Sequence, residues 1–424
     1  MRSKTFWLKY KFMLQSQLFS KTKKNIKKDL SRGLYFLLKG DFVEEVASGV
    51  YTFLPLGYLV LKKIENLIRE EMLNLETQEL LMPALHPKTL WQKTERWEKI
   101  DPPLFKLEDR HQKELCLAPT HEELITLHAQ KRISSYKDLP LALFQIQEKF
   151  RNEMRPKGGL LRQREFLMKD LYSFHENEKS ALEFYEKVKN SYLKIFNEKL
   201  NLDAKVCQAD VGTIGGKLSH EFMVELEIGE DIIFFCEKCH FFANKEVVKE
   251  KFCPYCKKKL QFFRGVEVGH IFFLGDKYSK VFDLKFKDKE GKEKMVLMSC
   301  FGVGISRLMQ TIAEKKSDDE GIVWPEVISP FDFHLILFFS QKEEKKIKKE
   351  GFFLYKTLKK KGYSVLLDDR KKSFGEKLAD ADIIGISKRL ILSPRTLKEG
   401  KIEFKKRNEK KSKLFKIKEF LKIC

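Results

Sequence analysis

An arginine, a carboxylate and an aromatic ring gather around one charged loop of this sequence. Arg151 and Glu153 follow the apolar run 142–150, and Arg164 and Phe166 come after the loop. Residues two apart on a strand point to the same face, and a ring on the facing strand can close over them. Such a surface suits a nucleotide, because arginine binds phosphate, a carboxylate accepts from an exocyclic amine and a phenyl ring stacks on the base. Taken alone, the pattern is more often a salt-bridged sheet surface.

A second candidate is the Gly-x-Gly segment that runs from Gly302 through Gly304 to Arg307. Glycines let a ligand approach the backbone closely, and the helix expected to start here favours anions. Arg307 adds a possible phosphate contact. By itself, a lone Gly-x-Gly more often reflects tight packing than a binding site.

Four of the eight cysteines form two close pairs. The pairs are Cys236 with Cys239 and Cys253 with Cys256, a spacing that predicts a tetrahedral zinc site. All four ligands would come from the protein, so the zinc would be structural; reduced structural cysteines are the alternative. Such sparse cysteine use also suits a reducing compartment and predicts a cytoplasmic protein.

The elements that must position these residues follow from hydrophobic spacing. A helix is expected over 57–76, feeding a strand Leu80–Pro83 that proline ends, and two antiparallel strands, 142–150 and 165–174, flank the charged loop. A helix over 178–200, a Cys-rich insert over 232–265 and strand-like runs over 266–309 follow. Beyond Pro330 the apolar runs alternate as βαβαβ, which marks a domain boundary.

Length and charge bound the function. With 424 residues, 42% of them hydrophobic, two or three domains are expected, and both disorder and a membrane-spanning protein are excluded. The net charge is 83 − 61 = +22, and residues 330–424 contribute 27 − 13 = +14. This excess favours a polyanion partner about as strongly as it favours solvated lysine faces. Residues 1–28 hold nine basic and no acidic residues, so they suggest either organelle import or an extension ahead of a start at Met13.

Together these features resemble the three motifs of class II aminoacyl-tRNA synthetases. The helix and strand ending at Pro83 resemble motif 1, the dimer-interface motif, while the Arg-x-Glu and Gly-x-Gly segments resemble motifs 2 and 3. Other segments are similar to bacterial-type prolyl-tRNA synthetase, and the resemblance runs from about Gly40 to the C-terminus. Threonyl-, seryl- and glycyl-enzymes share the general motifs but not this set: Ala47–Pro55, Pro119–Glu123, Arg164–Asp170, Ser219–Phe222, Gly269–Phe272 and Gly321–Pro325.

The resemblance implies an α+β protein with three parts. A basic segment, 1–39, precedes a class II catalytic domain with an antiparallel sheet, 40–329, which contains the zinc-binding insert; an α/β anticodon-binding domain, 330–424, follows. It also implies a homodimer that activates proline with ATP and Mg²⁺ and transfers it to tRNA(Pro). The family's large editing domain is missing between motifs 2 and 3. A pocket for proline excludes the smaller alanine only weakly. We therefore expect that the enzyme mischarges tRNA with alanine and depends on a separate editing deacylase.

The resemblance also assigns roles to single residues. Thr120 and Glu122 would bind the proline ammonium, although a helix N-cap with an acidic first turn explains them locally. Lysines that contact only phosphate would resemble anticodon-reading residues equally well. The implied proline site also includes His175, His220 and Cys300; the implied ATP site comprises Arg151, Glu153, Arg164, Phe166, Gly302, Gly304 and Arg307; and the implied anticodon site comprises Asp369, Arg370 and Lys377.

Two rival functions remain. The first is a non-catalytic synthetase-like protein that binds RNA or a partner; the intact Arg151, Arg307 and Glu122 argue against it, because a decayed site should lose some of them. The second is a synthetase for another amino acid. The Thr120-x-Glu122 and Ser219–Phe222 segments argue against that one.

Overall fold

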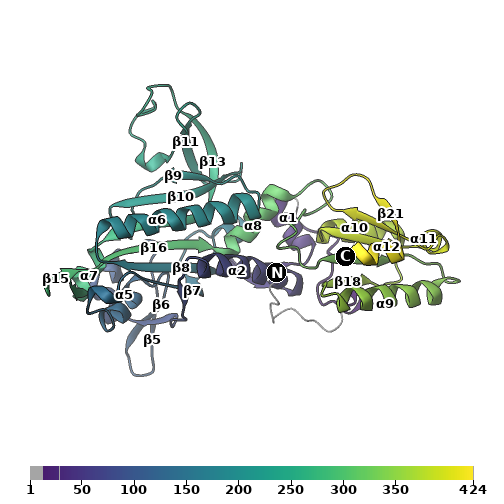
Figure 1. The fold of residues 1–424 in the computed structure, drawn as a ribbon, viewed down its shortest axis with the longest axis horizontal. Helices are drawn as coiled ribbons and strands as arrows, with labels where there is room; N and C mark the ends of the chain where they lie inside the picture. Colours follow the sequence, from purple (N-terminus) through teal and green to yellow (C-terminus); the bar gives the residue numbers. More distant parts are fainter. Residues whose placement is uncertain (1–12, 28, 424) are drawn as a thin grey trace. The chain divides into compact units, whose positions relative to one another are not determined.

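The computed structural model describes residues 13–27 and 29–423 (Figure 1). Residues 1–12, the suggested extension ahead of Met13 and the first part of the basic segment 1–28, lie outside the described residues. The chain forms two compact units. The larger comprises Glu45–Tyr51 and Ile64–Thr311, and the smaller comprises the described parts of Met1–Glu44, Thr52–Lys63 and Ile312–Cys424.

A nine-stranded sheet forms the centre of the larger unit, in the order β10-β9-β12-β11-β13-β16-β8-β7-β3. The two strands expected around the charged loop are β7 and β8, paired antiparallel with Phe150 opposite Glu165. Strand β13 also pairs antiparallel with β10, β11 and β16. The strands are β3 (Gln78–Glu79), β7 (Leu141–Phe150), β8 (Glu165–His175), β9 (Lys205–Gln208), β10 (Leu218–Glu225), β11 (Asp231–Cys236), β12 (Phe241–Asn244), β13 (Gln261–Gly275) and β16 (Leu297–Gly304).

Helices and small sheets surround this sheet. Helix α6 (Glu178–Leu193) packs across β8, β13 and β16 on one face, as Figure 1 shows. A three-stranded sheet, β4-β6-β5, precedes helix α5. The remaining bounds here are α2 (Pro55–Leu73), which continues from the smaller unit, β1 (Val43–Ala47), β2 (Val50–Phe53), β4 (Leu85–Pro87), α3 (Lys88–Lys93), α4 (Arg96–Lys99), β5 (Phe105–Glu108), β6 (Glu114–Leu117), α5 (Glu122–Gln130), α7 (Lys277–Phe282), β14 (Lys285–Lys287), β15 (Glu293–Met295) and α8 (Ile305–Lys316).

The smaller unit is built on a five-stranded sheet in the order β18-β17-β19-β20-β21. The expected βαβαβ pattern is present, since β17 pairs in parallel with both β18 and β19. Strands β20 and β21 extend the sheet antiparallel. No helix within residues 13–27 and 29–423 is long and apolar enough to cross a membrane. The bounds are α1 (Arg32–Lys39), β17 (Phe333–Leu337), α9 (Glu344–Lys360), β18 (Val365–Asp368), α10 (Phe374–Ile384), β19 (Lys388–Leu392), α11 (Pro394–Lys398), β20 (Lys401–Lys406), β21 (Lys413–Lys416) and α12 (Ile417–Ile423).

One local prediction was wrong. The strand expected over Leu80–Pro83 lies two residues earlier, as β3, because only that segment pairs regularly with β7. The Gly-x-Gly segment was expected to lead into a helix, and it does: Gly302 and Gly304 lie within the last three residues of β16, and α8 begins directly after them at Ile305. Gly302 therefore belongs to the sheet surface, and Gly304 adjoins the helix N-terminus.

Candidate active site

The floor of the site is a row of residues that crosses four strands. Asp170 on β8 lies opposite Gly302 on β16, which lies opposite His270 on β13, which lies opposite Glu221 on β10. A second row joins Tyr172, Cys300 and Phe272 in the same way. Because side chains alternate between the two faces of a strand, these residues share one face. Gly302 leaves the middle of that face open for a ligand.

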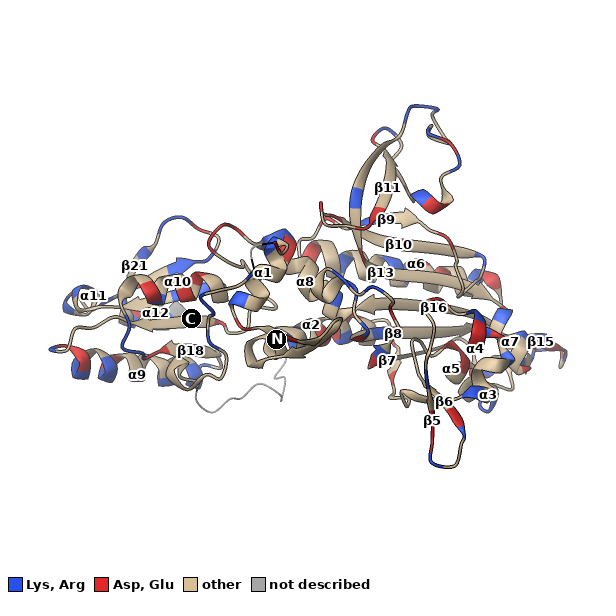
Figure 2. Ribbon diagram, turned by 180° about the vertical axis from the view of Figure 1, so that it is seen from behind, with Lys and Arg blue, Asp and Glu red and all other residues tan. Residues whose placement is uncertain are grey.

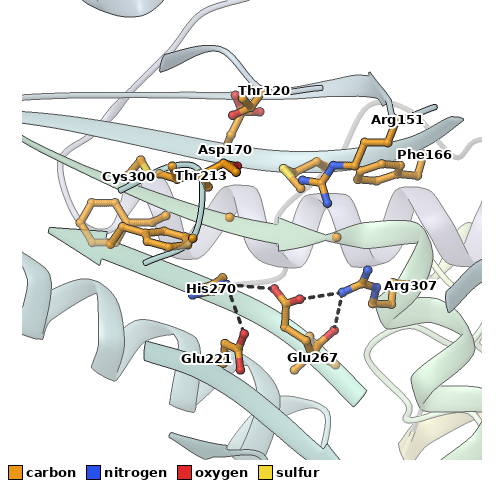
Figure 3. A pocket seen from close by; sticks show the side chains of 18 of the residues that line it. Thr120, Arg151, Phe166, Asp170, Thr213, Glu221, Glu267, His270, Cys300 and Arg307 are labelled. Carbon is orange, nitrogen blue, oxygen red and sulfur yellow. Dashed lines mark hydrogen bonds and ion pairs between the residues drawn. The ribbon is translucent and has the colours of Figure 1, made fainter. Parts of the chain in front are cut away.

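A cavity of about 400 Å³ lies over this floor. Its walls come from the end of β7, the loop before β8, the start of α5, the loop 210–214 and the start of α8. It brings together most of the residues singled out in the sequence. Figure 3 shows Thr120 and Cys300 toward one end of it and Arg151, Phe166 and Arg307 toward the other.

The end with the two arginines is suited to an anion. The Arg151 guanidinium lies 5.1 Å from the centre of the Phe166 ring. Burial, followed by the nearby charge of Arg307, lowers the pKa of Arg151. Because two cations close together repel each other, a phosphate placed between them would be bound strongly. Glu153 pairs with Arg162 at 2.7 Å, so its carboxylate is held beside the loop.

Two carboxylates and an imidazole form a cluster opposite Arg151. The His270 Nδ1 lies 3.5 Å from a Glu267 oxygen and 3.7 Å from a Glu221 oxygen, and Arg307 binds Glu267 at 2.9 Å (Figure 3). Burial, and next the Glu267 charge, raises the pKa of Glu221 to about 7. Burial alone would also raise the pKa of Glu267, but His270 and Arg307 hold it well below its usual value.

The other end of the cavity holds a hydroxyl and a buried carboxylate. The Thr120 hydroxyl donates to Glu122 at 2.6 Å, and both side chains line the cavity. Arg96 approaches Glu122 from outside the cavity lining at 3.5 Å and binds Glu123 at 2.8 Å. Burial, and next the Glu122 charge, raises the pKa of the Cys300 thiol well above its usual range, so this thiol is neutral. An ammonium with two N–H donors would find two acceptors here.

Three residues predicted for the site do not line the cavity. Side chains alternate between the two faces of a strand, and Asp170 on β8 and Glu221 on β10 face the cavity. His175 is five residues from Asp170 and His220 is one residue from Glu221, so both imidazoles point to the opposite face, under α6. There His175 bonds to Ser180 at 2.9 Å and His220 to Tyr185 at 2.8 Å. Arg164 also turns away from the cavity, because its guanidinium donates to the backbone oxygens of Glu153 and Ser48.

Sequence analysis missed other residues that line the cavity. Asp170 accepts from Gln145 at 2.9 Å and pairs with the buried Lys149 at 2.8 Å. The alternation of Phe166, Met168 and Asp170 along β8 was the signal that could have found it. The carboxylates of Glu221 and Glu267 carried no such signal, because only the pairing of β10 with β13 brings them together.

The paired cysteines converge in the insert. All four Sγ atoms of Cys236, Cys239, Cys253 and Cys256 lie within 4.8 Å of one another. Strands β11 and β12 carry the first pair between them, and a turn ahead of β13 carries the second. Four thiolates so close together form the donor set that tetrahedral zinc prefers.

The residues predicted to read the anticodon are engaged within the smaller unit. Lys377 is only 1% exposed, and its ammonium donates to the Leu337 carbonyl oxygen at 2.6 Å, so in this structure its side chain is not presented to a base. Arg370 binds Asp368 through two nitrogens and Asp380 through a third. Asp369 accepts from the Ser16 hydroxyl at 2.7 Å.

Comparisons with known proteins agree with this geometry. The family model described as "tRNA synthetase class II core domain (G, H, P, S and T)" matches residues 105–316, and "Anticodon binding domain" matches residues 334–424. The proline–tRNA ligase of Ehrlichia ruminantium is 38% identical over 402 residues, which covers 91% of this chain and 93% of that protein. The proline–tRNA ligase of Sulfurihydrogenibium is 35% identical, covering 93% and 96%.

A solved structure has the same fold. Prolyl-tRNA synthetase of Giardia lamblia, in complex with prolyl-adenylate, matches with a TM-score of 0.78 at 21% identity, over 92% of this chain and 77% of that one. The expected α+β class, with an antiparallel catalytic sheet and an anticodon-binding domain, is confirmed. The chain therefore belongs to the proline–tRNA ligase family of class II aminoacyl-tRNA synthetases.

Proposed function

We propose that this chain activates proline with ATP and transfers the prolyl group to the 3′ end of tRNA(Pro). First, a carboxylate oxygen of proline attacks the α-phosphorus of ATP, forming prolyl-adenylate and releasing pyrophosphate. The terminal ribose 3′-hydroxyl of the tRNA then attacks the acyl carbon and releases AMP. The observation that carries the proposal is that one cavity holds an ammonium site at Thr120 and Glu122 and an anion site at Arg151 and Arg307.

Each end of the cavity has its own task. Thr120 and Glu122 accept the two N–H groups of the proline ammonium, and the neutral Cys300 bounds the pocket without adding charge. Arg151 binds the α-phosphate and stabilises the charge that develops there, while Arg307 binds the terminal phosphate. Phe166 stacks on adenine, and Glu153 accepts from its amine. Catalysis then rests on positioning and electrostatic stabilisation.

The acid cluster fits magnesium. The ligand atoms of Glu221, Glu267 and His270 lie within 4.8 Å of one another, and two carboxylates are the hard oxygen donors that Mg²⁺ prefers. We assign Glu221 and Glu267 as its protein ligands. Bound there, Mg²⁺ would neutralise phosphate charge on ATP. His270 is a positioning residue, because it orients Glu267. The Nε2 of His270 is held in turn by a hydrogen bond with the Ser219 hydroxyl at 2.6 Å.

The four insert cysteines fit a structural zinc, which we assign to them on their donor set and spacing.

A homodimer is proposed because apolar residues beside the edge strand β3 are exposed: Leu73 is 49% exposed and Leu81 is 74% exposed. Exposed leucines on a sheet edge favour burial against a second copy. A cytoplasmic location is proposed because none of the seven described cysteines forms a disulfide.

We further propose that this chain does not hydrolyse mischarged alanyl-tRNA itself and relies on a separate deacylase. The alignment with the Sulfurihydrogenibium relative runs over 546 positions, more than the 424 residues of this chain, so that relative carries segments that this chain lacks. The alignment with the Ehrlichia ruminantium relative runs over only 402. Hydrolysis of alanyl-tRNA(Pro) by the purified enzyme alone would contradict this proposal.

The test of the main proposal is amino-acid-dependent ATP–pyrophosphate exchange with proline, alanine, cysteine and threonine. Exchange should be fastest with proline and be lost in Arg151→Ala, while Arg110→Ala, at an exposed arginine outside the cavity lining, should keep it. A folded protein that supports no exchange with any of the four would favour the non-catalytic RNA-binding function instead.

A further inference from the structure

The cysteine insert presents aromatic rings to solvent. Phe252 is 53% exposed, Tyr255 70% and Phe262 66%. The rings are nevertheless supported: Tyr255 meets Phe241 edge to face at 5.8 Å, and Phe262 lies against Phe234 at 6.2 Å. Large exposed rings that pack on other rings, as Tyr255 and Phe262 do, are suited to stacking on a further ring.

Unpaired positive charge surrounds these rings. Residues 249–264 contain six Lys and Arg and one Glu, a net charge of 6 − 1 = +5. Lys257, Lys258 and Lys259 are exposed, and none of the three forms an ion pair with any residue in the described part of the chain. Figure 2 shows blue segments on the loops beyond β11. We call Phe252, Tyr255, Phe262 and these three lysines the insert face.

One strand connects the insert face to the active site. Strand β13 carries Phe262 near its start and then Glu267 and His270, which line the cavity. Glu267 lies five positions after Phe262, which at about 3.4 Å per position is roughly 17 Å along the strand. The pairings of β13 with β10 and β11 put Phe262 on the face of the strand opposite Glu267, so the path from the cavity to this ring is longer than that distance. A stacked nucleic-acid strand advances about 3.4 Å per nucleotide, so the path corresponds to at least about five nucleotides.

We propose that the insert face binds the acceptor arm of tRNA next to its unpaired 3′ end. The lysines contact phosphates, and the rings stack on bases, as in other proteins that bind single-stranded RNA. A tRNA whose terminal ribose enters the cavity has its next nucleotides within reach of this face. The inference rests on the proposed aminoacylation function and adds to it the surface that guides the 3′ end.

The test compares three variants of the full-length enzyme. The first carries Lys257→Glu, Lys258→Glu and Lys259→Glu, and the second carries Phe262→Ala. The matched control carries Lys287→Glu, Lys289→Glu and Lys292→Glu, which reverses three exposed lysines around the β14–β15 hairpin of the same unit. Binding of a tRNA(Pro) transcript, and of a minihelix that contains only its acceptor arm, is measured across a range of salt concentrations.

We expect the first variant to bind both RNAs about 10- to 100-fold more weakly, with a log–log salt slope smaller by about 2 to 3, as three lost phosphate contacts require. Phe262→Ala should weaken binding about 5- to 50-fold, because one stacking contact is lost. Proline-dependent exchange should stay within about twofold of wild type in all variants, which also shows that they are folded. The control should bind both RNAs like wild type.

Unchanged RNA binding and charging in the first two variants would overturn the inference, and so would a loss seen with tRNA but not with the minihelix. If sedimentation showed that these variants lose self-association while RNA binding is unchanged, the face would belong to a second copy of the chain. Absence of exchange in the wild-type enzyme would instead refute the proposed function, so the two failures are distinguishable.

Discussion

Arg96 is predicted to set the affinity for proline without touching it. Its side chain is 6% exposed, and its guanidinium binds Glu123 at 2.8 Å and the Tyr278 hydroxyl at 3.0 Å. The same nitrogen lies 3.5 Å from Glu122, the carboxylate proposed to receive the proline ammonium. The Trp91 ring supports the guanidinium at 5.2 Å. Arg96 therefore holds the two glutamates side by side from behind the cavity.

The perturbation is Arg96→Lys, which keeps the charge but not the planar group. The lysine ammonium ends one bond short of the Arg96 nitrogen that binds both Glu123 and Tyr278, so at least one hydrogen bond to a charged group is lost, at a cost of about 1.5–3 kcal/mol of folding stability. Glu122 loses its fixed neighbour and no longer matches the ammonium. If half of this cost appears in binding, the KM for proline rises about 4- to 13-fold, while kcat and the KM for ATP change less than about twofold.

The assay is ATP–pyrophosphate exchange at varied proline and varied ATP, with thermal unfolding of the same samples. Arg132→Lys is the matched control, because the guanidinium of this exposed arginine, just after α5, donates only to the His128 carbonyl oxygen among the described residues. An Arg96→Lys enzyme with a lower melting temperature but an unchanged KM for proline would show that Arg96 is purely structural. A fall in kcat at constant KM would also refute the reasoning.

Three further outcomes are expected. The purified enzyme should contain about one zinc per chain. The Cys253→Ser variant should lose the zinc and become protease-sensitive within 232–265, while the control Cys207→Ser should keep it. A metal-free wild type would contradict the zinc assignment. Lys377→Met should unfold at lower denaturant concentration without changing the preference for the proline anticodon, since this lysine is buried; a changed preference at equal stability would restore it as a contact residue. Hydrogen bonds from Arg407 lower the pKa of Asp318 to about 2, below its unfolded value of about 3.9, so the pair stabilises the fold above pH 4 and loses this effect as the pH falls toward 2. Because Asp318 is partly exposed, Asp318→Asn should cost only about 0.5–1 kcal/mol at pH 7, and the difference in melting temperature should shrink between pH 5 and pH 3; a constant difference would contradict this.

Local patterns in the sequence predicted the strands and the residues whose roles depend on one segment. Strands β7 and β8 follow from two apolar runs around a charged loop, and Thr120 and Glu122 are placed by the start of α5. Where other side chains point depends on features that only the folded chain has. The faces of His175 and His220 depend on strand parity relative to α6, and the burial of Lys377 depends on β17, forty residues away in the sequence.

The attachment of the cysteine insert has a consequence for engineering. The chain leaves the sheet at Asn244, the end of β12, and returns at Gln261, the start of β13, with only β11 between these two strands. At about 4.8 Å per strand spacing, exit and return lie about 10 Å apart, which is close to the separation of the termini in many small domains. The intervening segment is thus a natural graft point for a reporter domain with closely spaced termini. Because this segment carries Cys253 and Cys256, the grafted domain must also brace the ends of β12 and β13 in place of the zinc assigned to the four cysteines.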